Sequence, residues 1–420
     1  MLMSQLRELV LDAHPLEQLL AAARPEFAAI LERSLHGEEL GFEDGLALLA
    51  ADGPDLVALI RTADHVRATD VGPVVTYVVN RNINFTNVCF VGCQFCAFAR
   101  LRKDDDARTD TTADVLGKVQ QAIDCGASEI CMQGGINPDM DAFVYRDLLV
   151  AIKKEFPKIH VHAFSPMEIM YGARRTSMSY RDYIQMLKDA GLGTIPGTAA
   201  EILDDEVREI LSHKKVDVRT WVDIITTAHK LGVRTSSTIM YAHIEKPEHI
   251  VRHVELLRSI QKETGGFTEF VPLRFIHTYT TLYQKGLVDP PAKGPIDMRM
   301  YAFSRLMLRG HINNLQTSWV KLGTPLAQLS LAAGCNDFGG TLMEEQISKS
   351  AGADAGEYLP VEAIRSLIEA AGRIPRERTT LYGRVAVEDR AGEGTSWRST
   401  SLTTGSAPDQ HQPDRAAASA

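Results

Sequence analysis

The chain has 420 residues, of which 45% are hydrophobic and 24% are charged, with 31 glycines and 18 prolines. These proportions are those of a globular protein, and they exclude collagen, coiled coil and wholesale disorder. The formal net charge of −9 provides no overall attraction to nucleic acid or to an anionic membrane. We therefore expect small molecules or other proteins as partners. The length suits one large domain with additions as well as two domains.

The first residues, MLMSQLRELVLDAHPLEQ, mix acidic residues into the apolar run and lack the basic-then-apolar order of a signal peptide. No uninterrupted apolar stretch of the sequence approaches the ~18 residues of a membrane span. We therefore expect a cytoplasmic protein that does not bind membranes, and in that compartment the six cysteines should not form disulfides. Three of these cysteines fall within eight positions, which makes metal binding the leading question.

Residues 1–72 are predicted to form an α-helical N-terminal extension. Apolar residues recur at helical spacing around Phe27, Leu46 and Leu56, with glycine-containing breaks between these segments. From Val74 onward the pattern changes to short β-branched runs that alternate with amphipathic helical stretches. This alternation is typical of βα units that form a parallel sheet.

Residues 73–352 are predicted to form the main domain. The expected strands are Val74–Val79, Glu129–Gln133, Ile159–Phe164, Leu192–Pro196, Val233–Tyr241, Glu269–His277, Leu315–Val320 and Cys335–Phe338. The expected helices lie near residues 112–125, 141–155, 179–190, 201–212, 217–231, 247–264, 296–309 and 343–350. Eight such units predict an α/β fold of the TIM-type (βα)8 barrel class, closed or partly open.

Three junctions between strand and helix carry the S/T-x-x-E pattern of a capping box: Ser165–Glu168, Thr198–Glu201 and Thr341–Glu344. Each junction follows a strand, which places it on the C-terminal face of the barrel, where the active sites of such barrels lie. Residues 353–386 are predicted to be a helical segment packed on the barrel. Residues 387–420 are rich in small and polar residues without apolar periodicity, which predicts a disordered tail.

Cys89, Cys93 and Cys96 form a C-x3-C-x2-C loop directly after the first expected strand, and Gly92 lets this loop fold tightly. Iron–sulfur clusters are held by cysteine thiolates, commonly four, so three without a fourth nearby leave one iron open to a substrate. A zinc site with a fourth ligand elsewhere is the alternative, although no second C-x2-C or paired histidine follows at finger-like spacing. Incidental core cysteines beside a turn are a further interpretation. The other cysteines, at positions 125, 131 and 335, are interpreted as small buried apolar residues.

Residues 80–100, which contain this loop, resemble the radical S-adenosylmethionine superfamily. The resemblance implies that the three thiolates hold a 4Fe–4S cluster whose free iron binds S-adenosylmethionine, and that one electron then releases a 5′-deoxyadenosyl radical. It also implies that Gly134 and Gly135 meet the methionine amino group and that Glu201 receives the ribose hydroxyls. From the residues alone, the glycine pair is compatible with a simple turn and Glu201 with a helix cap.

From about residue 20 to residue 385, the chain resembles one subgroup of that superfamily, the 5-amino-6-(D-ribitylamino)uracil–L-tyrosine 4-hydroxyphenyl transferases, which form the second subunit of FO synthase in coenzyme F420 biosynthesis. The resemblance is carried by the strings NRNINFTNVC, EICMQGGINP, HAFSPMEI, GTIPGTAAEILDDEVR, NDFGGTLMEE and GRIPRERTTLYG. The subgroup includes two menaquinone enzymes of the futalosine route, and residues 197–201 are closer to the deazaflavin pattern than to that of cyclic dehypoxanthine futalosine synthase. Departures from the pattern are Ala242, Cys335 and Arg274, the last of which adds a charge near the end of the sixth expected strand.

The resemblance implies that the 4-hydroxybenzyl group of L-tyrosine is joined to C5 of 5-amino-6-(D-ribitylamino)uracil, with 2-iminoacetate, 5′-deoxyadenosine and methionine as the other products. An electron donor is also implied. Because the chain has no second C-x3-C-x2-C, FO synthase subunit 1 would be a separate polypeptide. A menaquinone-pathway enzyme is the alternative on the same scaffold, and a non-catalytic iron–sulfur or zinc protein is the alternative from another class.

Two polar substrates require amides, hydroxyls and charged groups at the ends of strands. His160 and His162 alternate along one expected strand, so their side chains should share a face. Structural roles compete with substrate contact for these histidines and for the asparagine and aspartate before the eighth loop. The candidate substrate contacts are Asn82, Asn84, His162, Tyr241, His243, His277, Asn336, Asp337 and Glu345.

Overall fold

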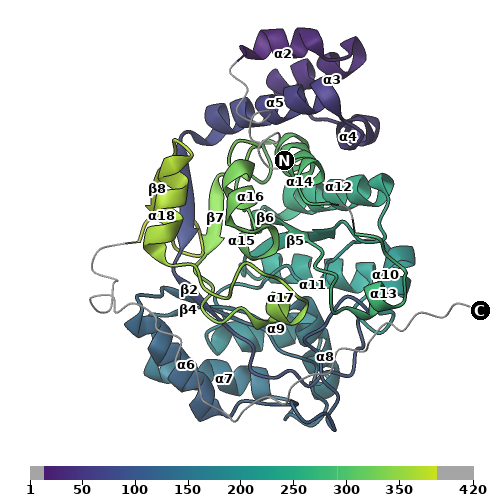
Figure 1. The fold of residues 1–420 in the computed structure, drawn as a ribbon. Helices are drawn as coiled ribbons and strands as arrows, with labels where there is room; N and C mark the ends of the chain where they lie inside the picture. Colours follow the sequence, from purple (N-terminus) through teal and green to yellow (C-terminus); the bar gives the residue numbers. More distant parts are fainter. Residues whose placement is uncertain (1–13, 291, 386–420) are drawn as a thin grey trace, which may run out of the picture.

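The described part of the predicted extension 1–72, from residue 14 onward, consists of helices joined by short turns. The computed structural model describes residues 14–290 and 292–385, so the predicted disordered tail 387–420 lies outside the described residues. Helices α2 (Leu16–Ala22), α3 (Pro25–Leu35), α4 (Phe42–Leu49) and α5 (Gly53–Val71) gather at one end of the molecule (Figure 1). Their apolar faces join the same hydrophobic core as the barrel, with α5 packed against α14 (Pro295–Met307).

The first barrel strand consists of two pieces: β1 (Val74–Val78), which agrees with the predicted strand Val74–Val79, and β2 (Asn80–Ile83), which was not predicted. The division has a local cause, because the Thr341 hydroxyl takes the place of a backbone partner at Asn80. This hydroxyl accepts a hydrogen bond from the Asn80 N–H (3.0 Å) and donates one to the Asn80 carbonyl oxygen (2.7 Å). Polar side chains at this junction thus shift the register between the barrel's first strand and its last.

The strands form a closed ring in parallel register. β1 pairs with β7 (Asp337–Gly340), β2 pairs with β3 (Glu129–Met132), and β3 pairs with β4 (His160–Ala163). β5 (Thr235–Tyr241) pairs with β6 (Phe267–Arg274). Single bridges complete the ring: His162 with Thr194, Ile195 with Thr235, Phe270 with Leu315, and Gln316 with Asp337. The ring confirms the TIM-type barrel.

Two of the predicted strands are much shorter than expected. Residues 192–196 and 315–320 contribute only bridging residues, and at Trp319 the chain already enters the short helix α15 (Trp319–Leu322). The C-terminal segment contains the expected helix, α18 (Val361–Ala370), and an unpredicted strand, β8 (Ile374–Glu377), which pairs with β1. The predicted domain boundaries stay predictions, because the extension, barrel and α18 share one hydrophobic core.

Amphipathic helices surround the ring (Figure 1). Each turns its apolar side inward, as α11 (Val218–Lys230) does with Trp221, Ile224 and Ile225. The others are α6 (Thr112–Asp124), α7 (Val144–Glu155), α8 (Pro166–Thr176), α9 (Tyr180–Asp189), α10 (Asp205–Ser212), α12 (Pro247–Thr264), α13 (Thr281–Gln284), α16 (Thr324–Ser330) and α17 (Gln346–Ser350). Among residues 14–290 and 292–385, no helix has both the length and the apolar character needed to cross a membrane.

Only one of the three predicted capping boxes forms. The Ser165 side chain caps α8, and the Glu168 carboxylate accepts a hydrogen bond from the Ser165 N–H (2.6 Å), as predicted. The boxes predicted at Thr198–Glu201 and Thr341–Glu344 are wrong, because α10 begins at Asp205 behind an Asp204 cap and α17 begins at Gln346. Backbone φ is positive at Glu201 (41°) and at Glu344 (74°), which is incompatible with a helical first turn there.

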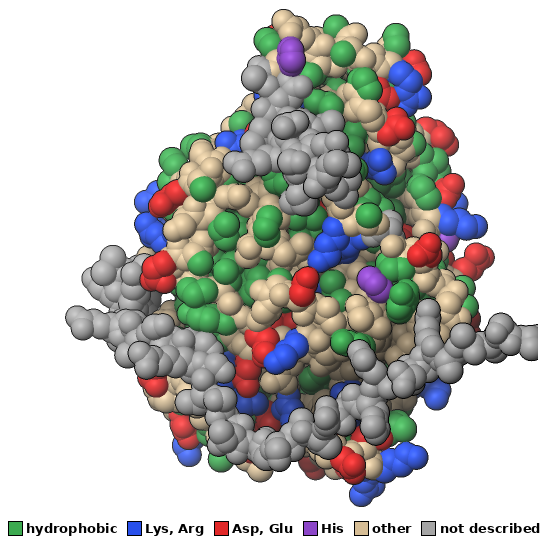
Figure 2. Space-filling view, viewed as in Figure 1, with side chains coloured by type: hydrophobic (Ala, Val, Ile, Leu, Met, Phe, Trp, Pro, Cys, Tyr) green, Lys and Arg blue, Asp and Glu red, His purple; other side chains and the backbone are tan. Residues whose placement is uncertain are grey.

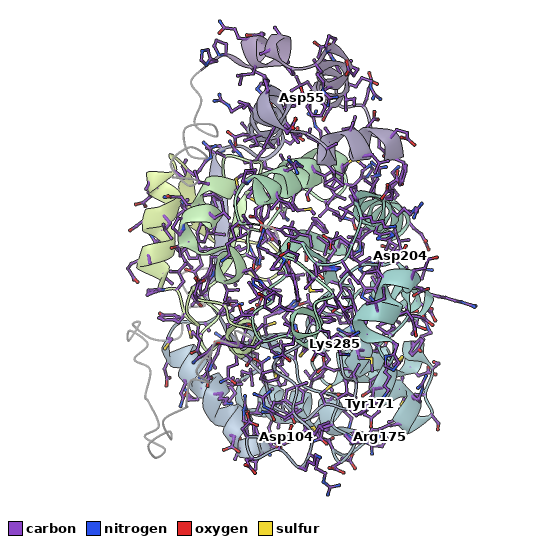
Figure 3. All side chains as sticks on the ribbon, turned by 45° about the vertical axis from the view of Figure 1, so that its right-hand side comes forward. Asp55, Asp104, Tyr171, Arg175, Asp204 and Lys285 are labelled. Atoms are coloured by element: carbon purple, nitrogen blue, oxygen red, sulfur yellow. The ribbon has the colours of Figure 1, made fainter. Side chains whose placement is uncertain are left out.

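The helical extension and the segment that follows the cysteine loop lie at opposite ends of the view in Figure 3. In Figure 3, Asp55 of α5 lies at the top and Asp104, which follows the cysteine loop, lies at the bottom. Figure 2 shows acidic and basic side chains interspersed over the face that it displays.

Candidate active site

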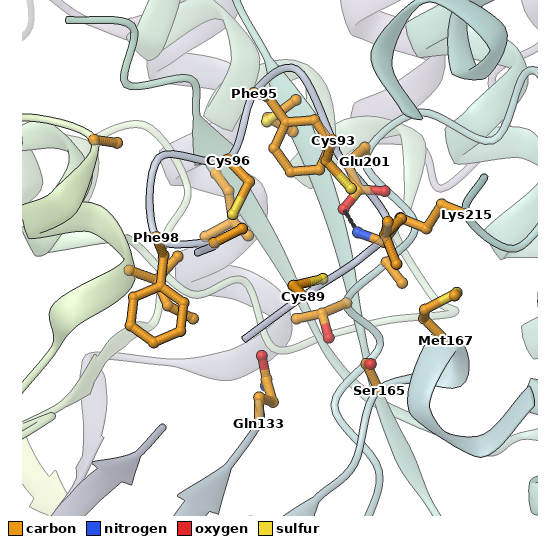
Figure 4. Close-up of a pocket in the computed structure, with 18 of the residues that line it drawn as sticks. Cys89, Cys93, Phe95, Cys96, Phe98, Gln133, Ser165, Met167, Glu201 and Lys215 are labelled. Carbon is orange, nitrogen blue, oxygen red and sulfur yellow. Dashed lines mark hydrogen bonds and ion pairs between the residues drawn. The ribbon is translucent and has the colours of Figure 1, made fainter. Parts of the chain in front are cut away.

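A cavity of about 240 Å³ lies at the carboxyl ends of the barrel strands. Its lining comes from the loops that follow strands far apart in the sequence, as in other barrels of this type. Cys89, Cys93 and Cys96 all line it, and Figure 4 shows them on one loop around the same space. Beside them lie Gln133, Gly134, Gly135, Ser165, Glu168, Glu201, Lys215, Arg274 and Lys321, among other residues.

The cysteine loop is fastened to its surroundings through Gln94. Its backbone N–H donates to the Leu211 carbonyl oxygen, and its own carbonyl oxygen accepts from the Leu282 N–H, both at 2.8 Å. Its side chain donates to the Ile210 carbonyl oxygen and accepts from Lys285 Nζ at 3.0 Å. Gln94 therefore joins the loop to the ends of α10 and α13. No sequence motif indicates this role of Gln94.

The arrangement of the three cysteines fits a cluster better than a single metal ion. Within residues 14–290 and 292–385, no three side chains of the His, Cys, Asp and Glu types converge closely enough to hold one ion. Zinc requires ligands that meet at one point, whereas an iron–sulfur cluster binds its thiolates at separate irons. The three sulfurs share one cavity, as thiolates that bind separate irons of a cluster would.

Two of the three thiols, those of Cys93 and Cys96, are protonated in the chain alone. Burial raises the pKa of Cys93 to about 12 and also raises the pKa of Cys96, and nearby Lys215 acts in the opposite direction on both. Metal binding requires thiolates, so loading the site would release protons.

Gly134 and Gly135 pack directly against the cysteine loop. A Cβ atom on Gly135 would lie 2.3 Å from the Val88 carbonyl oxygen, and one on Gly134 would lie 2.7 Å from the Phe85 ring. Both backbone N–H groups donate to protein acceptors, Gly134 to Glu168 at 3.0 Å and Gly135 to Thr86 at 2.8 Å. Neither carbonyl oxygen accepts a backbone hydrogen bond from the described part of the chain. Both carbonyl oxygens are therefore available to a ligand, and the role of the pair in binding S-adenosylmethionine stays a prediction.

Glu201 lies in the cavity as an ion pair instead of a helix cap. Lys215 Nζ is 2.7 Å from Glu201 Oε1, the contact drawn as a dashed line in Figure 4, and Arg208 Nη1 is 3.5 Å from Oε2. Lys215 also lies 5.0 Å from the centre of the Phe95 ring. Burial acts to lower the pKa of Lys215, but the attraction of Glu201 and Cys93 together outweighs burial, so the pKa of Lys215 is raised overall. Sequence reasoning missed Lys215, because no local motif connects it with Glu201.

Glu168 combines its capping role with a contact to the glycine pair. Its carboxylate accepts from the Ser165 backbone and hydroxyl and from the Gly134 N–H. Burial nevertheless raises the pKa of Glu168 to about 7. Lys321 and Arg274 add two further charged groups to the cavity lining. The Arg274 guanidinium donates a hydrogen bond to the Asp297 carboxylate at 2.6 Å.

The nine candidate substrate contacts lie outside the lining of this cavity. His162 and His160 share a face as expected, since their ring nitrogens lie 2.7 Å and 2.8 Å from the Thr194 hydroxyl. Burial lowers the pKa of His162 to about 4, so this ring is neutral at pH 7. The buried Oδ1 atoms of Asn82 and Asn84 accept no hydrogen bond from residues 14–290 or 292–385.

The other candidates contact protein groups. The Tyr241 hydroxyl donates to Asp297 (2.7 Å), and Asn336 Oδ1 accepts from Arg305 (2.6 Å). The remaining four are engaged as follows: His243 lies 3.1 Å from the Glu245 carboxylate, the His277 ring packs against Tyr283, Asp337 pairs with Arg378, and Glu345 caps α17. All nine stay predictions as substrate contacts.

Comparison with known proteins decides the family. Residues 83–257 match the radical SAM superfamily, and residues 264–390 match the CofH/MqnC C-terminal region. A 5-amino-6-(D-ribitylamino)uracil–L-tyrosine 4-hydroxyphenyl transferase of Methanothermobacter thermautotrophicus is 49% identical over 84% of this chain and 96% of its own length. The chain belongs to the radical SAM superfamily. Within it, the chain belongs to the family of that transferase. The protein is therefore a radical SAM enzyme that uses a 4Fe–4S cluster and S-adenosylmethionine, and not the non-catalytic metal protein of the alternative interpretation.

Larger relatives contain this radical SAM chain as one part. The FO synthase of Streptomyces avermitilis is 54% identical over 82% of this chain, and that of Mycobacterium tuberculosis H37Rv is 49% identical over 84%. The matched regions are only 40% and 42% of these synthases, so the chain spans about two fifths of their length.

Solved structures share the radical SAM fold. Methylornithine synthase superposes with a TM-score of 0.65 at 17% identity, covering 82% of this chain and 97% of its own. The hydrogenase maturase HydG of Carboxydothermus hydrogenoformans gives 0.67 at 14% identity, covering 93% and 87%. These likenesses show the fold alone.

Proposed function

We propose that this radical SAM enzyme joins the 4-hydroxybenzyl group of L-tyrosine to C5 of 5-amino-6-(D-ribitylamino)uracil, releasing 2-iminoacetate. One observation carries the proposal: the likeness to the transferase of that name runs through 96% of the transferase's length at 49% identity. The reaction belongs to the assembly of the FO deazaflavin, which the names of the larger relatives also support. We place it in the cytoplasm, where the cysteine thiols stay reduced.

Cys89, Cys93 and Cys96 would hold the cluster, because they are three thiol donors around one cavity. The carbonyls of Gly134 and Gly135 would accept from the methionine amino group, and Glu201 would accept from the ribose hydroxyls. When bound, the cluster and S-adenosylmethionine supply the radical that takes a hydrogen atom from L-tyrosine and leads to cleavage of its Cα–Cβ bond.

The chain's own residues orient the substrates and exclude water. Apolar side chains, among them Val91, Phe98 and Phe275, line the cavity and limit the access of solvent to reactive species. Gln133, Thr198 and Thr238 add neutral polar groups to the same lining. Such groups suit the uracil amides and the ribityl hydroxyls, which carry no charge.

The partner that closes the deazaflavin ring would be a separate FO synthase subunit 1. The proposal is supported by the likeness to the Methanothermobacter transferase, whose name gives it the transfer step alone. An external one-electron donor would reduce the cluster.

The test is an anaerobic assay of the full chain with its cluster reconstituted. Reduced enzyme receives S-adenosylmethionine, L-tyrosine and 5-amino-6-(D-ribitylamino)uracil, and products are identified by mass spectrometry. The expected result is a tyrosine-dependent adduct carrying the hydroxybenzyl mass, together with 5′-deoxyadenosine. Formation of 5′-deoxyadenosine without the adduct would refute the substrate assignment. Turnover of dehypoxanthine futalosine would then identify the menaquinone enzyme, whose family shares the C-terminal region.

A further inference from the structure

The cavity is lined by a partly buried lysine that forms no ion pair among the described residues. Three basic side chains line it, and two of them form ion pairs, Lys215 with Glu201 (2.7 Å) and Arg274 with Asp297 (2.6 Å). The third, Lys321, makes no ion pair with any residue of 14–290 or 292–385. Burial lowers the pKa of Lys321, and only Glu345 and Cys96 attract its proton from a distance.

Lys321 is held on a rigid support. It lies on α15, where the Trp319 ring nitrogen donates to the Gly340 carbonyl oxygen (2.9 Å) across the end of β7. The Lys321 N–H donates to the Ser318 carbonyl oxygen (3.1 Å), and its neighbours Val320 and Leu322 are buried. The backbone that carries the ammonium group is therefore fixed at the edge of the cavity.

Glu345 does not serve as the missing partner. Its carboxylate already accepts from the Ser348 N–H at 2.9 Å, where it caps α17, and it lies beyond ion-pair distance from Lys321. An ammonium group partly withdrawn from solvent without a counterion is disfavoured, and an anion delivered by a ligand would offset that cost. The site therefore suits a ligand with a carboxylate.

The position of Lys321 separates it from the groups proposed for S-adenosylmethionine. Gly134, Gly135 and Glu201 follow the second and fourth strands of the ring, whereas Lys321 follows the seventh. The wall on that side contains Leu273, Phe275 and Ile276, which follow or end β6 and offer an apolar surface to an aromatic ring. An aromatic amino acid matches both features, whereas the ribitylaminouracil carries no acid group.

We propose that the ammonium group of Lys321 binds the α-carboxylate of L-tyrosine. The inference rests on the proposed function, because it names a residue that recognises one of its two substrates. Lys321 contributes to specificity by requiring an acidic group on the amino-acid substrate, and its anchored helix fixes where that group lies.

The test combines a residue change with a substrate change. Lys321→Met keeps the length of the side chain and removes its charge, and L-tyrosinamide keeps the phenol and removes the carboxylate. Lys230→Met, on the exposed side of α11, serves as the matched control. Binding of L-tyrosine, L-tyrosinamide and S-adenosylmethionine to the reconstituted, unreduced holoenzyme is measured by titration calorimetry, and cluster content is measured from iron and sulfide.

The expected result is that Lys321→Met weakens L-tyrosine binding about 30-fold or more, the usual effect of removing one partner of a buried charge pair. The preference of the wild type for L-tyrosine over L-tyrosinamide should disappear in this variant, while cluster content and S-adenosylmethionine affinity stay unchanged. Unchanged L-tyrosine affinity would overturn the proposal, as would an equal loss for both amino-acid ligands or a loss confined to S-adenosylmethionine. If the wild type itself neither binds nor consumes L-tyrosine, the proposed function fails, and this inference fails with it.

Discussion

Replacing Gly135 with alanine should strain the cysteine loop. The added Cβ atom would lie 2.3 Å from the Val88 carbonyl oxygen and 3.0 Å from Cys89 Cβ, and Cβ atoms essentially never approach other atoms within 3.0 Å. The Val88 peptide leads directly into Cys89, so a shift of at least 0.7 Å at Val88, the difference between 2.3 Å and 3.0 Å, also displaces this cysteine. Overpacking of this kind typically costs about 1–3 kcal/mol.

The strain should be felt when the cluster binds. Without a cluster the loop relaxes away from the alanine, whereas a bound cluster requires Cys89 to return. A cost of about 1–3 kcal/mol then corresponds to a loss of about 5- to 150-fold in cluster affinity. Iron and sulfide per chain after anaerobic reconstitution measure this loss, and urea unfolding followed by circular dichroism measures the stability of the chain.

Gly117→Ala provides the matched control. Gly117 lies on α6, and a Cβ atom added there would meet no other atom within 4 Å, so alanine encounters no obstacle. Alanine is also the better helix former, and the control should gain about 0.5–1 kcal/mol in the free energy of unfolding with full cluster content. The reasoning is refuted if Gly135→Ala retains a full cluster and differs from the wild type by less than about 0.5 kcal/mol in stability.

Three further predictions concern the cluster, a buried ion pair and a buried acid. Cys89→Ala should lose the 4Fe–4S absorption, whereas Cys125→Ala, a partly buried cysteine outside the loop, should keep it; equal iron content in both variants would contradict the ligand assignment. Arg378→Met leaves Asp337 buried without its cation, so the free energy of unfolding in urea should fall by about 3–5 kcal/mol, and a fall below about 1 kcal/mol would show that the pair contributes little. Burial raises the pKa of Glu269 from 4.5 to about 7, so the folded chain holds this proton more tightly than the unfolded chain. The stability of the wild type should therefore fall as pH rises between these two values, and Glu269→Gln should remove this part of the slope in unfolding curves recorded across that range.

Features that depend on residues close together in the chain could be predicted from the sequence. The C-x3-C-x2-C spacing placed Cys89, Cys93 and Cys96 on one loop, and their joint lining of the cavity agrees with it. The alternation of short β-branched runs with amphipathic helices gave the barrel. The Ser165–Glu168 cap could be found because its two partners are three residues apart.

Which polar groups meet across the barrel depends on contacts between distant elements and could not be predicted from the sequence. The Glu201 carboxylate meets Lys215, fourteen residues away, instead of capping a helix, because positive backbone φ at Ala199 and Glu201 keeps this loop out of a helical turn. The Thr341 hydroxyl, predicted to cap a helix, binds Asn80, 261 residues away, and divides the first strand.

The same limit applies to the choice of cavity residues. Several polar side chains at strand ends were equal candidates in the sequence, yet Tyr241 and Asp337 pair with Asp297 and Arg378, which lie on elements far away in the chain. Lys321, which carries no motif, lines the cavity because Trp319 anchors its helix across the end of β7. Periodicity and spacing report which residues are near in sequence, whereas packing between distant elements decides which charges are paired and which are left for a ligand.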